Sequence, residues 1–293
     1  MSDCAVLYFE DERTQALRFA QAAGLPAHEV ERHRFPDGEL KLRLPPAPPR
    51  RLIVYRSLAL PNEKLVELLF VARTARRLGA EDLTLVCPYL AYMRQDIAFR
   101  DGEVVSQSVM GEFLASLFDA VVTVDPHLHR VATLAEAVPV RRPTVLSGAP
   151  LLGDYIVRQR PGAFLLGPDS ESAQWIASAA RAHGLDHAVC DKVRHGDREV
   201  DIRLPPVSLA GRAVVLLDDV ASSGRTLARA AQAALQAGAA SVDVAVTHAL
   251  FAEDALRIIL DAGVSEVWST DCIAHPSNVV NMDSLLAAAV AGG

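Results

Sequence analysis

Short apolar runs alternate with amphipathic helical stretches along almost the whole chain. The runs are as long as β-strands and rich in Val, Ile and Leu, which is typical of strands buried on both faces of a parallel sheet. Eight are predicted as strands: 5–10, 51–57, 83–89, 120–127, 163–169, 213–220, 242–250 and 264–271. Helical periodicity follows several of them, as at 62–80, 171–185 and 225–238. The alternation predicts right-handed βαβ units and an α/β fold with parallel sheets.

The predicted elements fall into two similar groups. Segments 83–127 and 187–250 share an order of apolar strand, polar loop or helix, and further apolar strand. The sequence therefore predicts two similar α/β domains, each with a mostly parallel central sheet flanked by helices. The proline-bearing stretch 137–150 is the expected boundary, which gives domains over 1–143 and 144–293.

The composition narrows the class of protein. With 51% hydrophobic and 22% charged residues, the chain has enough apolar side chains for full cores. The formal net charge of -7 argues against a general nucleic-acid-binding protein. The four cysteines show no C-x-x-C spacing, which favours reduced thiols and a cytoplasmic location. Neither a signal peptide nor a transmembrane helix is predicted, so we expect no membrane partner.

Segment 213–227 carries the most specific pattern in the chain. An apolar strand ends in Asp218 and Asp219, a loop of small and hydroxyl residues follows, and a helix begins near residue 225. Backbone N–H groups at the start of a helix, together with the helix dipole, favour an anion. Hydroxyl donors and close backbone approach are expected from Ser222, Ser223, Gly224 and Thr226.

The carboxylates of Asp218 and Asp219 need a partner other than that anion. Sugar hydroxyls or a metal ion suit them, so a phosphosugar would satisfy both halves of the segment. A strand followed by acids, a loop and a helix is also common in α/β proteins, where the acids only cap the helix. The loop is not a Walker A loop, because G-x-x-x-x-G-K-[ST] occurs nowhere in the chain.

A polar loop with Arg94, Gln95 and Asp96 follows the strand at 83–89. In α/β sheets, ligands bind at the carboxyl ends of the strands, which is where this loop is expected. An arginine there can hold a phosphate through two parallel N–H donors. On this segment alone, a surface salt bridge explains the arginine equally well.

Candidate metal ligands lie at two more strand ends. Asp125 and His127 end the strand at 120–127, where the imidazole could bind a metal or a phosphate; a capping aspartate and an ordinary histidine are equally favoured. If that segment is extended, His127 and His129 point to one face. Asp169 ends the strand at 163–169, where a carboxylate can hold Mg²⁺, although Ser170 with Glu171 also fits a helix N-terminus.

Two turns carry charged residues whose role the pattern leaves open. Lys192 and Arg194 are two residues apart, so a strand would place both on one side. Beside a phosphate site they could stabilise a charged transition state; otherwise they belong to a charged surface hairpin. Phe35, Asp37 and Glu39 surround a Pro-Asp-Gly turn, which by itself predicts only a hairpin.

Taken in order, these motifs resemble those of the ribose-phosphate pyrophosphokinase family, also called phosphoribosyl pyrophosphate synthetases. The matching segments are 35–39, 88–96, 124–127, 167–169, 191–194, 214–226 and 269–273. The Asp-Asp loop alone would fit any phosphoribosyltransferase, whereas the other segments are more specific. The short chain, Ser222 in place of an acid, and Asp-Pro-His in place of Asp-Leu-His look more like the shorter, archaeal-type branch.

The resemblance implies two phosphoribosyltransferase-type domains and one reaction. The C1 hydroxyl of ribose 5-phosphate would attack the β-phosphorus of ATP, so that a diphosphoryl group moves to the sugar and AMP leaves. Mg²⁺ and a homo-oligomer are also implied. By position, the 5-phosphate loop would consist of Ser222, Ser223, Gly224, Arg225 and Thr226. Asp218 and Asp219 would hold the ribose hydroxyls.

The same resemblance implies the remaining roles. ATP would lie along Arg94, Gln95, Asp96 and His127. His127 and Asp169 would bind Mg²⁺ and the ATP phosphates, and Lys192 and Arg194 would close over the transferring group on a mobile loop. Adenine would contact Phe35, Asp37 and Glu39 of a neighbouring subunit. Two alternatives stay open: a phosphoribosyltransferase that consumes the activated sugar, and a non-catalytic subunit that regulates a true synthetase.

Overall fold

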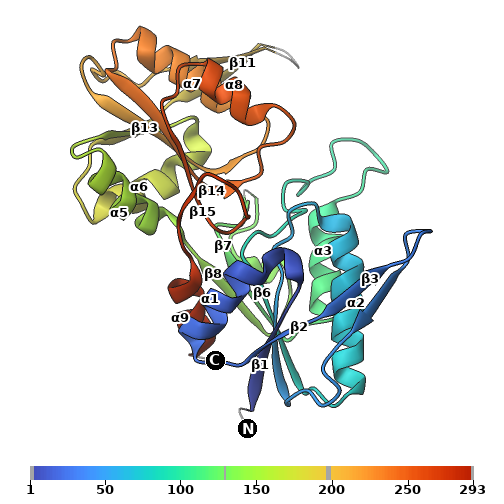
Figure 1. The fold of residues 1–293 in the computed structure, drawn as a ribbon. Coiled ribbons are helices and arrows are strands. Elements are labelled where there is room, and N and C mark those ends of the chain that lie inside the picture. The colour runs from blue at the N-terminus through green and yellow to red at the C-terminus, as the bar shows by residue number, and fades with distance from the viewer. Residues whose placement is uncertain (1–2, 129, 196–198, 292–293) are drawn as a thin grey trace. The chain divides into compact units, whose positions relative to one another are not determined.

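The computed structural model describes residues 3–128, 130–195 and 199–291. The chain divides into two compact units, Met1–Leu146 with Met282–Gly293 and Ser147–Asn281 (Figure 1). Each unit is built around a parallel six-stranded sheet, which confirms the predicted α/β class.

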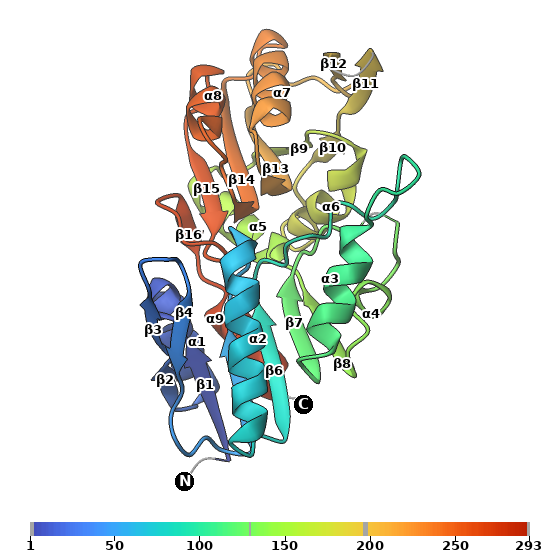
Figure 2. The same cartoon turned by 90° about the vertical axis from the view of Figure 1, so that its right-hand side faces the viewer.

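The sheet of the first unit has the order β2-β1-β5-β6-β7-β8. Its strands are β1 (Cys4–Tyr8), β2 (Ala27–Glu29), β5 (Arg51–Tyr55), β6 (Asp82–Cys87), β7 (Ala120–Val124) and β8 (Arg142–Leu146). The helices are α1 (Arg13–Ala23), α2 (Pro61–Arg77), α3 (Ser106–Ala115), the short α4 (Leu134–Ala137) and α9 (Asp283–Ala291), with a 3₁₀ turn η1 at Glu10–Glu12. Helices α2 and α3 cover one face of the sheet, and α1 and α9 cover the other (Figure 2).

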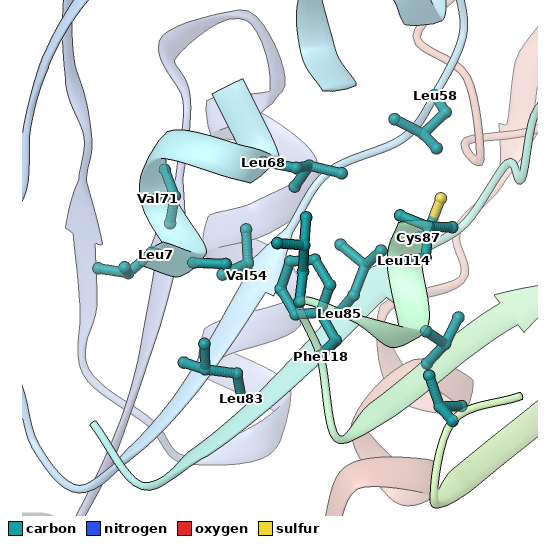
Figure 3. Close-up of a cluster of buried hydrophobic side chains, with 14 of the residues drawn as sticks. Leu7, Val54, Leu58, Leu68, Val71, Leu83, Leu85, Cys87, Leu114 and Phe118 are labelled. Carbon is teal, nitrogen blue, oxygen red and sulfur yellow. The ribbon is translucent and has the colours of Figure 1, made fainter. Parts of the chain in front are cut away.

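The core of the first unit shows why its strands are almost continuously apolar. Leu7, Val54 and Leu85 of three neighbouring strands pack against Leu68 of α2 and Leu114 of α3, and all are fully buried (Figure 3). Each buried side chain of this size stabilises the fold by about 1.5–3 kcal/mol.

The second unit repeats the plan, with the strand order β10-β9-β13-β14-β15-β16. Its strands are β9 (Phe164–Gly167), β10 (His187–Val189), β13 (Ala213–Ala221), β14 (Ser241–Ala249), β15 (Val267–Thr270) and β16 (Asn278–Val280). Its helices are α5 (Ala149–Gln159), α6 (Ala173–Arg181), α7 (Arg225–Gln236) and α8 (Ala255–Asp261), with a 3₁₀ turn η2 at Ser170–Ser172. Strand β10 is added on one side of β9 and strand β13 on the other, so the strand order reverses between β9 and β13. In the first unit the corresponding reversal lies between β1 and β5. In such sheets the crevice at the reversal is the usual ligand site.

Two antiparallel hairpins stand apart from the main sheets. One pairs β3 (Glu31–Arg34) with β4 (Leu40–Arg43), and the other pairs β11 (Asp191–His195) with β12 (Glu199–Arg203). Both predicted charged turns therefore lie on hairpins.

The two units differ from the predicted domains mainly at the C-terminus. The predicted boundary is 143/144, and the units meet at 146/147. The segment from Met282 onwards, which the prediction assigned to 144–293, joins the first unit because α9 packs on α1. Of the helices in the described part of the chain, none is long and apolar enough to cross a bilayer.

Candidate active site

The loop after β13 is shaped for close approach of a ligand. Gly224 has φ +70°, and a Cβ there would lie 2.8 Å from the carbonyl oxygen of Ala255. Only glycine meets both conditions without strain. Gly224 is also the N-cap of α7 and has no side chain to cap that helix. Neither Asp218 nor Asp219 therefore occupies the N-cap position.

A neighbouring loop holds the backbone of this segment in place. The N–H of Phe251 donates to the oxygen of Ala221 at 2.8 Å, and the N–H of Ala252 donates to the oxygen of Ser222 at 3.0 Å. The first N–H groups of α7 have no partner within the helix and point out of its N-terminus. Ser223 and Arg225 are exposed, and Ser222 and Thr226 are partly buried. The predicted 5-phosphate loop is thus preformed, with donors accessible to a ligand.

The tandem aspartates lie at the reversal of strand order in the second unit. The N–H of Asp219 donates to Oδ1 of Asp218 at 3.0 Å, and Asp219 is buried. Burial, followed by the charges of Asp219 and Asp169, raises the pKa of Asp218 well above its usual value. The carboxylates of Asp219 and Asp169 thus lie near enough to Asp218 for their charges to disfavour its ionised form. Such a group is stabilised by hydroxyl donors or by a cation.

Asp169 serves two purposes at the end of β9. It is the N-cap of η2, where its Oδ1 accepts the N–H of Glu171 at 3.1 Å, so the capping side chain is that of Asp169 rather than Ser170. It is also close enough to Asp218 to affect the pKa of that carboxyl. No group of three His, Cys, Asp or Glu side chains within the described residues could hold a metal by itself. Mg²⁺ is usually bound by only one or two carboxylates together with substrate phosphates, so these aspartates fit it.

In the first unit, the loop after β6 carries Arg94, Gln95 and Asp96. Arg94 is exposed. The Nε2 of Gln95 donates to the oxygen of Ile97 at 2.9 Å, and Asp96 forms an ion pair with Arg130 at 2.5 Å. The sequence gives no signal for Arg130, because the order of the strands brings it to Asp96.

His127 follows β7, which neighbours β6, so the two predicted ATP segments lie at the same edge of this sheet. His127 is partly exposed, whereas Asp125 is buried and has φ +36°. His129 lies outside the described residues. His127 and Asp169 lie on different units, and their joint binding of a metal stays a prediction.

The hairpin of β3 and β4 presents Phe35, Asp37 and Glu39 at its tip. The N–H of Phe35 donates to the oxygen of Glu39 at 2.8 Å, and Oδ1 of Asp37 accepts the N–H of Glu39 at 3.1 Å. The Phe35 ring is 39% exposed and stacks edge-on against His33. An exposed aromatic ring on a hairpin tip is suited to stacking on a flat ligand.

Lys192 and Arg194 occupy backbone positions on β11, where they pair with Ile202 and Val200 of β12. Their side chains lie outside what the structure describes, and so do residues 196–198 of the intervening turn. Their catalytic role stays a prediction.

The fold and the loop after β13 together define a protein of the phosphoribosyltransferase class. Residues 157–269 match the family model of the phosphoribosyl transferase domain. Residues 4–117 match the model of the N-terminal domain of ribose phosphate pyrophosphokinase.

Individual relatives over nearly the whole chain show the same family. The chain is 34% identical over 277 residues to the ribose-phosphate pyrophosphokinase of Methanopyrus kandleri, which covers 93% of this chain and 94% of the relative. It is 30% identical over 275 residues to that of Thermococcus kodakarensis, with 94% of each chain covered. The crystal structure of phosphoribosylpyrophosphate synthetase from Mycobacterium smegmatis shares the fold, with a TM-score of 0.85, 21% identity, and coverage of 99% and 98% of the two chains. The chain belongs to the ribose-phosphate pyrophosphokinase family.

Proposed function

We propose that this protein transfers the diphosphoryl group of ATP to the C1 hydroxyl of ribose 5-phosphate. The products are phosphoribosyl pyrophosphate and AMP. One observation carries the proposal: a loop held by two backbone hydrogen bonds, with a helix N-terminus at its end, directly follows two aspartates at the strand-order reversal of the second unit. The family assignment supports the same reaction.

Ribose 5-phosphate binds at the loop after β13. The 5-phosphate accepts hydrogen bonds from the loop and from the first turn of α7, where the helix dipole stabilises it. The residues in this role are Ser222, Ser223, Gly224, Arg225 and Thr226. The carboxylates of Asp218 and Asp219 accept hydrogen bonds from the ribose hydroxyls.

ATP binds to the first unit. Arg94, Gln95, Asp96 and His127 lie along the nucleotide. The tip of the β3–β4 hairpin contacts adenine through Phe35, Asp37 and Glu39 of a neighbouring subunit, so the active protein is a homo-oligomer.

In the chemical step, the C1 oxygen bonds to the β-phosphorus as the bond from that phosphorus to the α-phosphate oxygen breaks. The hydroxyl proton is lost, and AMP leaves. Side chains of the protein form no covalent bond; they align the reactants and stabilise charge. Lys192 and Arg194 donate to the oxygens of the transferring group. His127 and Asp169 would be the protein ligands of Mg²⁺, which would supply positive charge to the ATP phosphates.

Two other functions compete with this one. A phosphoribosyltransferase would use the same loop, but it needs only one such domain and gives no role to the Arg94–Asp96 loop. A non-catalytic subunit would be expected to lack part of the charged set, yet His127, Asp169, Lys192, Arg194, Asp218 and Asp219 are all present. An enzyme of this metabolism is expected in the cytoplasm.

The test is AMP formation by the purified protein from ATP, with and without ribose 5-phosphate and Mg²⁺. We expect AMP and phosphoribosyl pyrophosphate in equal amounts, only when both are added, and in the absence of any nucleobase. An inactive Asp218→Asn/Asp219→Asn variant controls for contaminating enzymes. Activity that requires a base would favour the phosphoribosyltransferase, and activity only with a second protein would favour the regulatory subunit.

A further inference from the structure

The β3–β4 hairpin has little apolar contact with the rest of its unit. All residues of β3 are exposed, and Leu42 of β4 is the residue of the two strands that packs against the core cluster, partly buried. The hairpin forms its own two-stranded sheet. Val30 and Leu44, which flank the two strands, are buried in the core cluster and anchor the base of the hairpin. An isolated pair of strands is marginally stable in water, so other contacts must hold the strands beyond that base.

Ion pairs to α2 and η1 supply those contacts. Nη1 of Arg32 on β3 lies 2.5 Å from Oε1 of Glu67 on α2, and its Nη2 lies 3.3 Å from Oδ1 of Asp11. Arg34 at the end of β3 pairs with Glu63, one turn before Glu67 on α2. The strand that leads directly to Phe35 is therefore tied to the unit by two arginines.

The carboxylates that receive Arg32 are themselves held by Arg56. Nη2 of Arg56 lies 2.5 Å from Oε2 of Glu67, and its Nη1 lies 2.8 Å from Oδ2 of Asp11. Glu67 and Asp11 thus each bridge the same two guanidinium groups, with one oxygen for each. Arg56 also stacks on the Phe9 ring, with its Cζ 4.5 Å from the ring centroid.

The ion pair of Arg56 with Glu67 is deeply buried, whereas the Asp11 side chain is 39% exposed. The side chains of Arg56 and Glu67 are 0% exposed, whereas that of Arg32 is 29% exposed. Removing two charges from water costs several kcal/mol per ion, and their attraction seldom exceeds that cost. Burial raises the pKa of Asp11, but the charge and hydrogen bond of Arg56 lower it below its usual value. Such a cluster is better explained by the geometry it fixes than by stability it adds.

The place of the cluster in the sheet supports this explanation. Arg56 directly follows β5, and Asp11 and Glu12 follow β1, so the cluster lies at the strand-order reversal of the first unit. At the corresponding place in the second unit lie Asp218, Asp219 and the loop after β13, which bind ribose 5-phosphate in the proposed function. In the first unit, protein charges occupy that place.

We infer that Arg56 is a positioning residue, which acts through Glu67 and Asp11 on Arg32 and so fixes the hairpin that carries Phe35, Asp37 and Glu39. The inference rests on the proposed function, in which that tip binds the adenine of ATP. It assigns no contact between Arg56 and substrate.

The test compares steady-state kinetics of the full-length variants Arg32→Gln and Arg56→Met. Since a hydrogen bond to a charged group contributes about 1.5–3 kcal/mol, we expect the KM for ATP to rise roughly tenfold or more in each variant. The kcat at saturating ATP and the KM for ribose 5-phosphate should stay within about twofold of wild type. The KM for ATP of the double variant should be little higher than that of either single variant, because both substitutions break the same chain of ion pairs.

Arg43→Gln is the matched control, because the ion pair of Arg43 is with Glu31 inside the same hairpin, at 3.0 Å, and not with a carboxylate of α2 or η1. It should leave all three constants unchanged. If Arg56→Met does not fold, Arg32→Gln alone tests the inference, because the Arg32 side chain is partly exposed. An unchanged KM for ATP, or equal changes for both substrates, would overturn the inference. An inactive wild-type protein would instead refute the proposed function.

Discussion

The guanidinium of Arg130 lies 2.5 Å from the carboxylate of Asp96 and joins the loop after β6 to the segment after β7. Asp96 is almost fully buried, with a side chain 3% exposed, whereas Arg130 is 54% exposed. Among the described residues, Oδ2 of Asp96 has no hydrogen-bond partner. Arg130 is therefore the group that balances a buried carboxylate next to the proposed ATP site.

Arg130→Gln should lower the free energy of unfolding by about 1–3 kcal/mol, because it leaves a buried charge unpaired. It should also raise the KM for ATP. Denaturant unfolding of Arg130→Gln, Asp96→Asn and the double variant measures the coupling, which we expect to be about 0.5–3 kcal/mol. Additive losses would show that the pair contributes nothing.

Gly224→Ala should impair binding of ribose 5-phosphate. Its Cβ would meet the Ala255 oxygen at 2.8 Å, so the loop must move. The matched control is Gly211→Ala, which has the same φ of +70° with nothing within 4 Å of the added Cβ. Both should lose about 1–2 kcal/mol of stability from backbone strain. Only Gly224→Ala should raise the KM for ribose 5-phosphate, and equal KM values would contradict the proposed role of the loop.

Lys192→Ala should cut kcat by roughly 10²-fold or more and leave ATP affinity nearly intact. Losing one preorganised donor to a developing charge costs about 2.7–4 kcal/mol in the barrier. Rapid-quench measurement of AMP formation, with ATP binding followed separately, checks both parts. Arg203→Ala on the paired strand β12 is the control for general loss of positive charge. Unchanged turnover in Lys192→Ala would remove this residue from the mechanism.

Asp119 gives the fold a predictable response to acid. Burial would raise its pKa, but hydrogen bonds from the N–H of Leu83 at 2.9 Å and from Arg76 at 2.5 Å, with the nearby charge of Arg141, lower it below the usual value. A lowered pKa contributes stability above the unfolded value of about 3.9, and that contribution is lost as the pH falls through the lower folded value.

Asp119→Asn should therefore destabilise the protein by about 1–3 kcal/mol at pH 7, and the difference from wild type should shrink below about pH 4. Denaturant unfolding over this pH range provides the measurement. Asp82→Asn, which breaks a more exposed pair with Arg142, should cost no more than about 1 kcal/mol. A difference for Asp119→Asn that stays constant down to low pH would show that its charge is not the cause.

The eight predicted strands all correspond to strands of the structure, because buried parallel strands are marked by continuous apolar runs. The edge strands of the two sheets, β2, β8, β10 and β16, could not be predicted in this way. Three of them have only three residues, and β2 reads Ala-His-Glu, so its conformation comes from pairing with β1. Helix α9 is apolar without clear periodicity, and the sequence alone does not indicate which domain it packs on.

In the candidate site too, local features could be predicted and contacts between distant segments could not. The loop from Asp218 to Thr226 is contiguous, so its chemistry could be predicted locally. The pairs Asp96–Arg130 and Arg32–Glu67 join segments brought together by the fold, and a single sequence gives no signal for them. Arg56 did give one signal, since a charged residue directly follows the apolar run 52–55.

The central claim is that the loop after β13 binds the 5-phosphate while Asp218 and Asp219 bind the ribose hydroxyls. A crystal structure of the protein with ribose 5-phosphate tests it most directly. The account predicts the phosphate against the N–H groups of residues 222–226, with the ribose 2- and 3-hydroxyls at the two carboxylates. Sugar bound elsewhere, with this loop empty at saturating concentration, would contradict it.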